Sequence, residues 1–572
     1  MSQLDWVVLA GWLIFVVAYG VWRGGRSRTA ESYLLAGREM RWGTVAISVM
    51  ATQASAITFL STPGQAYTDG MRFVQFYFGL PLAMIVLSAV AVPLYYRLKV
   101  TTAYELLETR FDLKTRTLTA GLFLLQRGLA VGLTIYAPSL ILSVIMGWDI
   151  RVTIAAIGTA VVIFTAAGGT RAVSRTHTVQ AAMIVAGMVA AAVVLVLALP
   201  ADVTLLDAVR LAGKGCRLNA IDASFNLNDR YTLWSGLLGG FFLQLAYFGT
   251  DQSQVQRYIS GQSVTASRLG LLFNGLAKVP MQFAILFLGA MVFAFYHFEA
   301  PPVFFNPVET AKVKASSHAG EFAALEGSYA DAVAVREVRA REMLHALDCA
   351  DDAARAGAEA AFSAASTNAA AVRQQAIGVM RAADPKANPS DTNYVFLTFV
   401  TRHLPSGLLG LLLAAVFAAA MNSSSSELNA LASTTVVDVY RRHLDPTASE
   451  RRTVLVGKLA TIGWGAFTIA LAESASRLGS LVEAVNILGS LFYGTILGVF
   501  LLAFFAKRLS GTAVFVAALL AEAGVIACFL FTGISFLWYN LVGCAAVVVI
   551  AMVLNPLTRR RGPGRGPALS LA

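Results

Sequence analysis

Long apolar segments, each bounded by short polar stretches, recur along most of this chain. An uncharged apolar helix of about 20 residues is long enough to cross the ~30 Å hydrocarbon core of a membrane. The pattern therefore predicts an all-α polytopic membrane protein with about thirteen transmembrane helices. The predicted spans are residues 5–22, 43–61, 73–96, 118–146, 152–167, 178–199, 232–250, 269–297, 406–436, 453–472, 480–505, 511–532 and 534–554.

The charged residues between these spans predict an orientation. Arginine and lysine gather in alternate connections, for example Arg97 and Lys99 after the third span and Arg441 and Arg442 after the ninth. The positive-inside rule then places the N-terminus outside and the C-terminus in the cytoplasm. Asp5, rather than a basic segment, stands at the start of the first span, which argues against a cleaved signal peptide.

Composition agrees with a membrane protein. Of the 572 residues, 57% are hydrophobic and 13% are charged, and the mean hydropathy is +0.65. Soluble domains are less apolar than this. The net charge of +11 lies in the alternate loops, so we expect membrane lipid and no nucleic acid as a partner. No Asn-x-Ser/Thr acceptor falls in a predicted external loop, which favours the cell (inner) membrane of a bacterium.

One segment does not fit the membrane pattern. Residues 309–391 are rich in alanine and charged side chains, and acid–base pairs four residues apart favour solvated helices. We therefore expect a helical hairpin on the external face. It is either an insertion that the fold tolerates or a docking surface for an external protein. Cys216 and Cys349 both fall in predicted external loops, where a disulfide is chemically permitted.

Another segment carries an unusual number of oxygen atoms for a membrane helix. After "GLLGLLLAAVFAAA" come Asn422 and four serines, Ser423 to Ser426. Ala419, Asn422 and Ser423 have the i, i+3, i+4 spacing of one helix face. A carbonyl, an amide oxygen and a hydroxyl there form half of a cage for a hard cation. Taken alone, the cluster is equally explained by close helix packing.

Two apolar segments in the two halves of the chain look interrupted. "SVMATQASAITFLSTPGQAYTDG", residues 48–70, is rich in Ala, Ser and Thr and contains Pro63-Gly64, and "FFLQLAYFGTDQSQVQRY", residues 241–258, is broken near Asp251. Paired interrupted spans are typical of secondary transporters built from inverted repeats. Their unwound carbonyls are tolerated in a membrane where they line a site.

The chain resembles the sodium:solute symporter family. The matching strings, in the family's order, are "YLLAGREMRW", "FLSTPGQAYTDG", "PLYYRLKVTTAYELLETRF", "AAGGTRAVSRTHTVQ", "GTDQSQVQRYISGQS" and "AAAMNSSSSELNALASTTVVDVY". The resemblance implies a leucine-transporter-type fold with two five-helix inverted repeats, one extra helix before them and two after. The implied divisions are residues 1–42 (extra helix and loop), 43–199 (first repeat), 200–231 (external loop), 232–505 (second repeat, interrupted by the insertion at 298–391) and 506–572 (two C-terminal helices and a basic tail).

The resemblance also implies a sodium site. Its ligands would be the backbone carbonyls of Ala51, Ala54 and Ala419 and the side-chain oxygens of Asn422 and Ser423. Family members usually carry two hydroxyls at the last two positions, so Asn422 is a departure.

A second departure is His177, which stands where many relatives carry an aspartate linked to sodium passage or to a second sodium. Without that carboxylate, a second ion site through Ser425, Ser426 and His177 is not favoured. His177 is then either a proton-sensitive group or, as we favour, a neutral hydrogen-bonding residue.

Solute contacts implied by the resemblance lie beside the sodium site. For Gln53 and Gln244, a hydrogen bond between helices is an equal alternative to contact with the solute. Lys278 lies inside a predicted span, and an ammonium at membrane depth is costly enough to be taken as a functional group. Arg127, also inside a predicted span, either anchors an anionic solute or pairs with a structural neighbour. The full set is Gln53, Thr58, Arg127, Gln244, Tyr247, Lys278 and Asn486.

The expected function is a secondary active symporter that couples inward sodium flow to uptake of a small organic solute by alternating access. The solute would be a sugar, carboxylate, amino acid or vitamin, and sodium the only cofactor. The alternatives are a proton-coupled or uncoupled transporter on the same fold and a non-transporting membrane sensor. No G-x-S-x-G, H-E-x-x-H or Walker A pattern occurs, so an enzyme is not expected.

Overall fold

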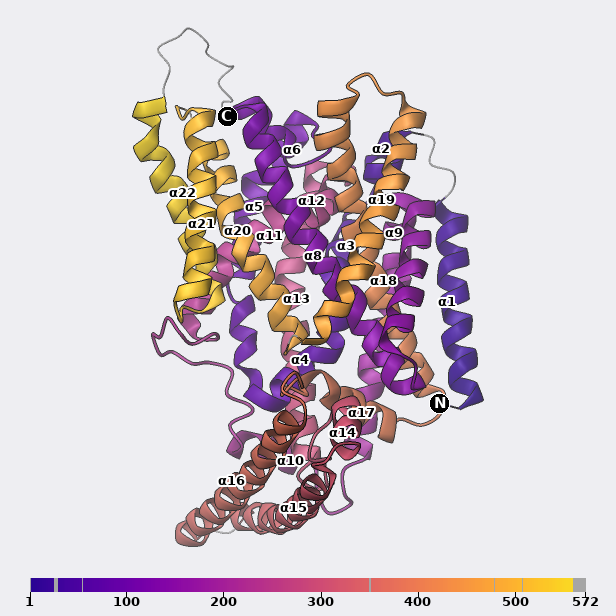
Figure 1. Ribbon diagram of the computed structural model, residues 1–572, viewed down its shortest axis with the longest axis vertical. Helices are drawn as coiled ribbons and strands as arrows, with labels where there is room; N and C mark the ends of the chain where they lie inside the picture. The colour runs from indigo at the N-terminus through magenta and orange to yellow at the C-terminus, as the bar shows by residue number, and fades with distance from the viewer. Residues whose placement is uncertain are drawn as a thin grey trace.

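The structure is a computed structural model that describes residues 2–24, 29–53, 55–348, 351–477, 479–506 and 508–558. Over these residues it is helical and contains no β-strand beyond an isolated bridge between Met40 and Gly261. The long helices form a bundle, and a helical hairpin covers one end of this bundle (Figure 1). The bundle helices are α1 (Gln3–Gly24), α3 (Trp42–Gln53), α4 (Ala56–Asp69), α5 (Leu80–Ala89), α6 (Ala91–Leu98), α8 (Leu113–Met146), α9 (Ile150–Leu197), α11 (Gly240–Thr250), α12 (Gln252–Ile259), α13 (Val264–Phe295), α18 (Leu408–Thr434), α19 (Glu450–Ala472), α20 (Leu481–Phe505), α21 (Gly511–Phe531) and α22 (Phe536–Thr558).

The predicted spans fall on these helices. Among the described residues, nine helical stretches are long and apolar enough to cross a membrane, and shorter apolar helices occur at Gln3–Val16 and Ile150–Ala166. Helix α9 contains two predicted spans. Both of its ends lie near the hairpin end. At the start of α9, Arg151 pairs with Glu473, directly after α19. Just after the end of α9, Asp202 pairs with Arg341 of the hairpin. The chain therefore crosses the bundle twice between residues 150 and 197.

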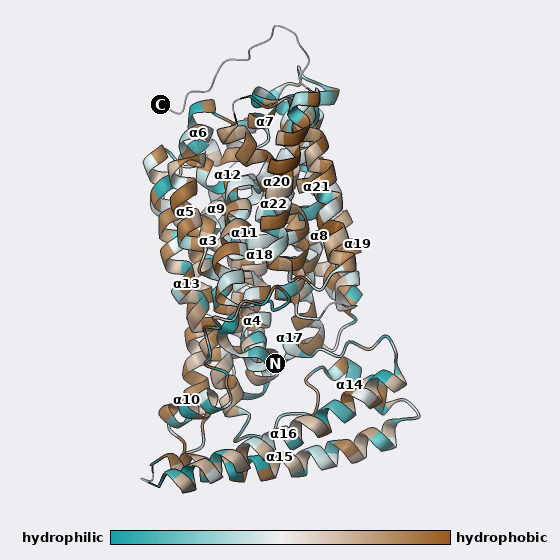
Figure 2. Cartoon of the chain, turned by 90° about the vertical axis from the view of Figure 1, so that its left-hand side faces the viewer, coloured by the Kyte–Doolittle hydropathy of each residue, from teal (hydrophilic) through white to brown (hydrophobic). Residues whose placement is uncertain are grey.

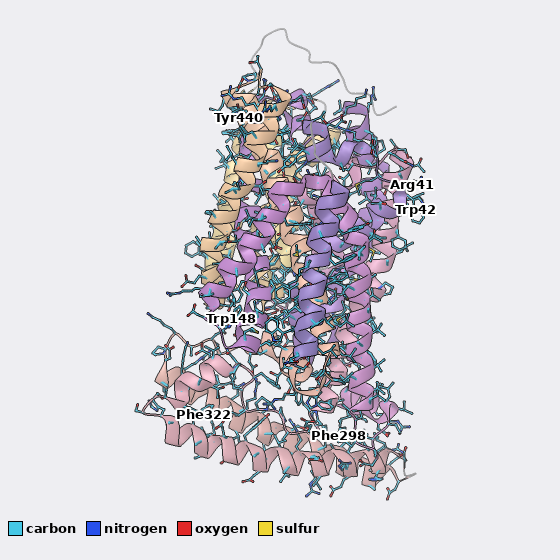
Figure 3. The ribbon with its side chains drawn as sticks, turned by 90° about the vertical axis from the view of Figure 1, so that its right-hand side faces the viewer. Arg41, Trp42, Trp148, Phe298, Phe322 and Tyr440 are labelled. Atoms are coloured by element: carbon cyan, nitrogen blue, oxygen red, sulfur yellow. The ribbon has the colours of Figure 1, made fainter. Side chains whose placement is uncertain are left out.

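Two exposed tryptophans lie at the two edges of the apolar surface of the bundle. Trp42, at the start of α3, and Trp148, just after α8, are 51% and 47% exposed. They lie towards opposite ends of the bundle (Figure 3). Tryptophan is enriched where a membrane meets water. The hydrophobic surface between them covers the long helices, whereas hydrophilic residues gather at the ends and on the hairpin (Figure 2).

The first interrupted span is divided into α3 and α4. Ser55 between them has extended backbone angles, φ −81° and ψ 168°, so the helical hydrogen-bond ladder stops there. Helix α4 continues through Pro63 to Asp69 and packs against α17 (Thr392–His403). Gly64 permits this contact, since a Cβ atom on it would lie 1.9 Å from the carbonyl oxygen of Thr392.

The second interrupted span breaks at Asp251, between α11 and α12. Its backbone is extended, and its carboxylate accepts a hydrogen bond from the backbone N–H of Ser253 at 2.8 Å. This is a side-chain cap on the first turn of α12. Both segments predicted to be interrupted are broken in the structure, but the first breaks at Ser55 and not at Pro63-Gly64, which lie inside α4.

The predicted helical hairpin is also present, as α14 (Pro307–Lys314), α15 (Ala319–Asp348) and α16 (Asp352–Ala383). It has an apolar core of its own that includes Phe322 and Val333, and it lies crosswise to the long helices (Figure 2). Arg373 of α16 binds both carboxylate oxygens of Asp391, directly before α17, at 2.7 Å. Cys216 is exposed and unbridged, whereas Cys349 lies outside the described residues.

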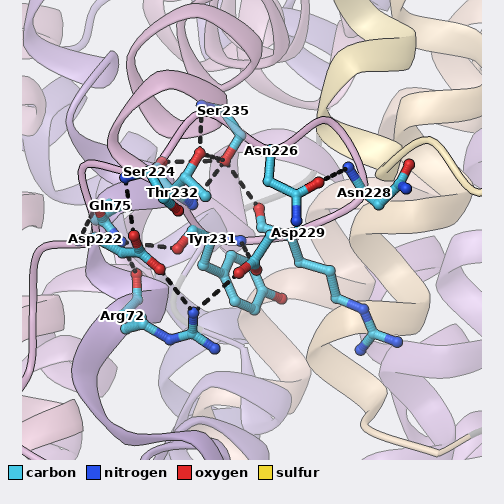
Figure 4. A network of polar contacts seen from close by, with 11 residues as sticks. Arg72, Gln75, Asp222, Ser224, Asn226, Asn228, Asp229, Tyr231, Thr232 and Ser235 are labelled. Atoms are coloured by element: carbon cyan, nitrogen blue, oxygen red, sulfur yellow. Dashed lines mark hydrogen bonds and ion pairs between the residues drawn. The ribbon is translucent and has the colours of Figure 1, made fainter.

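A polar network lies at the same end of the bundle and connects the loop after α10 (Leu205–Lys214) to the membrane helices (Figure 4). Arg72 donates to Asp222 and Asp229, each at 3.1 Å. Tyr231 donates to Glu483, in the first turn of α20, at 3.0 Å. The loop thereby ties the segment after α4 to the start of α20.

Candidate functional site

The first break faces the serine-bearing helix α18. The hydroxyl of Ser423 donates to the backbone carbonyl of Thr52 at 3.1 Å, and the hydroxyl of Thr58 donates to the carbonyl of Gln53 at 3.3 Å. These carbonyls belong to the last turn of α3, where no further helical N–H is available to them. The structure thus brings α18 against the unwound backbone, as the sequence predicted.

Asn422 lies one position before Ser423 and is 1% exposed. Both its side-chain oxygen and its side-chain nitrogen are buried without a hydrogen-bond partner among the described residues. A buried amide is normally satisfied by protein, water or an ion. Ala51 and Ala419 are also buried, at 2% and 0% exposure, whereas Ala54 lies outside the described residues.

The chemistry of this group of residues fits a sodium ion. It offers backbone carbonyls, one hydroxyl and one amide oxygen that has no other partner. Hard cations such as sodium take oxygen ligands of these types. When bound, the ion would add one positive charge between α3 and α18.

The residues of the candidate second ion site are occupied by hydrogen bonds. Ser425 donates back to the carbonyl of Met421 in its own helix. The Nδ1 and Nε2 atoms of His177 lie 2.9 Å and 3.5 Å from the hydroxyls of Ser48 and Ser426. His177 is fully buried in this contact between α3, α9 and α18.

A cavity of about 110 Å³ lies beside the first break. Helices α3, α4, α8, α11, α13, α18 and α20 all contribute to its wall. Ser423 lines it as well, so the cavity adjoins the candidate sodium site. All seven residues predicted to contact solute line this cavity, namely Gln53, Thr58, Arg127, Gln244, Tyr247, Lys278 and Asn486.

Gln53, Asn486 and Tyr247, like Thr58, already have hydrogen-bond partners in the protein. Gln53 donates to the side-chain oxygen of Asn274 at 2.8 Å, which is the inter-helix bond considered as an alternative. Asn486 donates to the carbonyl of Val482, one turn earlier, at 2.8 Å. The hydroxyl of Tyr247 accepts from Gln254 at 2.6 Å, which ties the cavity wall to α12.

Lys278 differs from them. Its side chain is 1% exposed, and no hydrogen bond or ion pair reaches it from the part of the chain that the structure describes. Its ammonium nitrogen lies 5.5 Å from the ring centroid of Tyr77, a weak cation–π contact. A cavity wall at membrane depth therefore carries a cation without a carboxylate beside it.

Arg127 has acidic partners instead. It forms ion pairs with Asp251 and, at 3.0 Å, with Glu427 of α18. The hydroxyl of Tyr493 joins the group by donating to Asp251 at 2.8 Å. Of the two interpretations of Arg127, the structure displays the structural pairing.

Glu427 and Tyr493 also line the cavity but were not predicted from the sequence. A carboxylate within an apolar segment was a signal for Glu427, because charge at membrane depth is costly. Its position one turn after Ser423 put it on the same face of the helix. For Tyr493 the sequence contained no comparable signal.

Comparison with known proteins agrees with this geometry. The model of the "sodium:solute symporter family" matches residues 33–326 and 372–521, most of the chain. The human sodium-coupled monocarboxylate transporter 1 is 27% identical over 501 residues, which cover 87% of this chain and 68% of the relative. The human sodium/iodide cotransporter is 31% identical over 297 residues, or 51% of this chain and 45% of the relative. A rabbit sodium-dependent multivitamin transporter is 26% identical over 88% of this chain and 66% of the relative.

Among solved structures, a Na⁺-coupled sialic acid symporter in a substrate-bound outward-open state shares the fold. The TM-score is 0.74 at 23% sequence identity, and the match covers 98% of each chain. The predicted fold class, a leucine-transporter-type arrangement of inverted repeats, is confirmed. The family match and the sodium-coupled relatives show that the protein is a sodium-coupled symporter, and these relatives are transporters, not enzymes. The chain therefore belongs to the sodium:solute symporter family.

Proposed function

We propose that this symporter carries a small organic anion, of the monocarboxylate type, into the cell together with sodium. The observation that carries this proposal is the isolated ammonium of Lys278 in the cavity wall. A solute carboxylate would supply the missing counter-charge and would form charge-assisted hydrogen bonds there.

The balance of charge around the cavity supports an anion. With Lys278 protonated and both acids ionised, Arg127 and Lys278 contribute two positive charges, and Asp251 and Glu427 contribute two negative charges. A bound sodium ion would leave this group with one excess positive charge. Because unpaired charge is expensive at membrane depth, a monovalent anion is the solute that neutralises the loaded site.

The names of the relatives point in the same direction. Two of them transport a monocarboxylate or iodide, and both of these solutes are anions. The family relationship alone leaves a wider set of solutes open, so the choice of an anion rests on Lys278.

For the ion, we propose a cage formed by the carbonyls of Ala51, Ala54 and Ala419 and by the side chains of Asn422 and Ser423. The unpartnered amide of Asn422 supports this assignment. Because Ser423 lines the solute cavity as well, sodium and solute would share one wall. Sodium would thereby favour the solute-binding conformation, which is the energetic basis of coupling.

We also propose that the hairpin end of the bundle faces the cell exterior and that the opposite end faces the cytoplasm. Helix α1 begins at the hairpin end and α22 ends at the other (Figure 1). Arg441, Arg442 and Arg508 follow spans that end away from the hairpin, in agreement with the positive-inside rule.

The test is uptake into proteoliposomes of an acid and of its neutral isostere, propionate and propionamide, under an inward sodium gradient. We expect sodium-dependent uptake of propionate and none of propionamide. Lys278→Gln should abolish propionate uptake, and Lys278→Arg, which keeps the charge, should retain part of it. Equal uptake of acid and amide, or an unchanged Lys278→Gln variant, would reject the anion and leave sodium-coupled transport of a neutral solute.

A further inference from the structure

One buried arginine connects two carboxylates that belong to different parts of the fold. The Nη1 atom of Arg127, on α8, lies 3.0 Å from the Oε1 atom of Glu427, on α18, and Nη2 pairs with the carboxylate of Asp251. The three side chains are 3%, 5% and 0% exposed. Interactions between charges are strong and weakly screened by salt at such depth.

Asp251 connects this cluster to the second break. Its Oδ1 atom accepts hydrogen bonds from the backbone N–H and the hydroxyl of Ser253, at 2.8 Å and 2.6 Å, while its Oδ2 atom faces Arg127 and Tyr493. A displacement of Arg127 would therefore disturb the cap that starts α12.

Glu427 connects the same cluster to the first break. It lies one turn after Ser423, whose hydroxyl donates to the carbonyl of Thr52 at 3.1 Å. Thr134 fixes the second oxygen of Glu427 by a hydrogen bond of 3.2 Å. A single turn of α18 thus contacts the unwound backbone of α3 through Ser423 and the break at Asp251 through Glu427 and Arg127.

We propose that Glu427 is the residue that couples the sodium site to the break between α11 and α12. Its carboxylate holds Arg127 against Asp251 while sodium keeps this turn of α18 beside α3. The carboxylate of Glu427 lies one turn from Ser423, so its negative charge is close to the proposed cation and raises sodium affinity. The inference rests on the proposed sodium site. It gives Glu427 a positioning role, which contact with the solute alone would not require.

The first test measures sodium binding without any solute. Purified protein in detergent is titrated with sodium, with choline keeping the ionic strength constant, and the rise in melting temperature gives the half-saturating concentration. We expect Glu427→Gln to raise this concentration at least tenfold. Glu427→Asp, which keeps the charge, should restore most of the affinity. Glu522→Gln removes another buried membrane glutamate, on α21, and should match the wild type.

A second readout separates coupling from simple loss of stability. In proteoliposomes the wild type should pass little ²²Na⁺ without solute, whereas Glu427→Gln should show a solute-independent sodium leak at least several-fold above it. A Glu427→Gln variant with wild-type sodium affinity and no leak would overturn the proposal. If that variant does not fold, Thr134→Val serves in its place, with a smaller shift in the same direction expected and no shift contradicting the role of Glu427.

The two proposals fail in different ways. A wild-type protein that sodium does not stabilise would refute the sodium site itself. A wild type that responds to sodium, together with an equally responsive Glu427→Gln variant, would refute only the coupling role.

Discussion

At the scale of single residues, the site depends on polar atoms that the rest of the fold leaves without partners. Asn422 and Lys278 could be identified from the sequence, because an amide and an ammonium are unexpected in apolar segments. Their lack of partners could not be foreseen, since it depends on how neighbouring helices pack. For Arg127, too, the sequence could not show which side chains lie beside it. Its sequence position allowed an anion anchor, and only the packing of α18 and the second break placed two carboxylates beside it.

The serine run provides a matched pair for testing the ion cage. Ser423→Ala removes the hydroxyl that faces the carbonyl of Thr52, whereas Ser425→Ala removes one that bonds within its own helix. We expect Ser423→Ala to raise the half-saturating sodium concentration by about tenfold, the effect of losing roughly 1.4 kcal/mol of ligation. Sodium-dependent melting of the purified protein measures both variants. Ser425→Ala should shift the concentration less than twofold, and equal shifts in the two variants would contradict the assignment.

His297, directly after α13, predicts a dependence of stability on pH. Burial lowers its pKa to about 3, and the charge of Arg336 acts in the same direction. The hydrogen bond from its Nδ1 atom to the carbonyl of Phe293, at 2.8 Å, acts against this shift without reversing it. The folded protein therefore keeps the ring neutral, whereas the unfolded chain binds a proton near pH 6.5. The stabilisation is complete above pH 6.5 and decreases as the pH falls, by about 2 kcal/mol at pH 5.

The measurement is the change in melting temperature between pH 7.5 and pH 5 for the wild type and for His297→Gln. Other groups also titrate in this interval, so the difference between the two proteins is the relevant quantity. We expect the variant to lose about 2 °C less than the wild type on acidification. Identical losses would mean that His297 is protonated without cost in the folded state.

At the scale of elements, the spans and their interruptions could be predicted because both depend on local composition. Apolar length predicts a membrane helix, and Asp251 marked the second break. For the first interrupted segment Pro63-Gly64 indicated the wrong position, because α4 runs through both residues and the break lies at Ser55. The double pass within α9 was predicted as two spans for the same reason. What could not be predicted is which elements meet, for example α17 on α4, because that contact joins residues far apart in the chain.

The contact between α4 and α17 can be tested at one glycine. A Cβ atom at Gly64 would lie 1.9 Å from the carbonyl oxygen of Thr392, whereas a Cβ atom at Gly43, in α3, would meet nothing within 4 Å. Because backbone cannot yield as a side chain does, we expect Gly64→Ala to destabilise the protein by about 1–3 kcal/mol. Gly43→Ala should be neutral or slightly stabilising. Thermal unfolding of the two variants measures this, and equal midpoints would exclude close packing of α17 on α4.

At the scale of the whole molecule, two interrupted helical segments and the serine-bearing helix α18 contribute to the wall of one cavity. The family relationship and the confirmed fold explain why these three elements come together. The hairpin adds a layer at one end, where Arg373 and Asp391 connect it to α17. The family model matches residues 33–326 and 372–521, so residues 327–371 of this hairpin lie outside the match.

The central claim is that a sodium ion, held where the break between α3 and α4 meets α18, drives solute entry. Uptake of radiolabelled propionate into proteoliposomes at a fixed pH, with an external medium of sodium, potassium or choline, tests this most directly. We expect accumulation above the external concentration in sodium only, with its loss in Asn422→Ala and Ser423→Ala. Accumulation that persists when choline or potassium replaces sodium, or that requires a pH gradient instead, would contradict the claim.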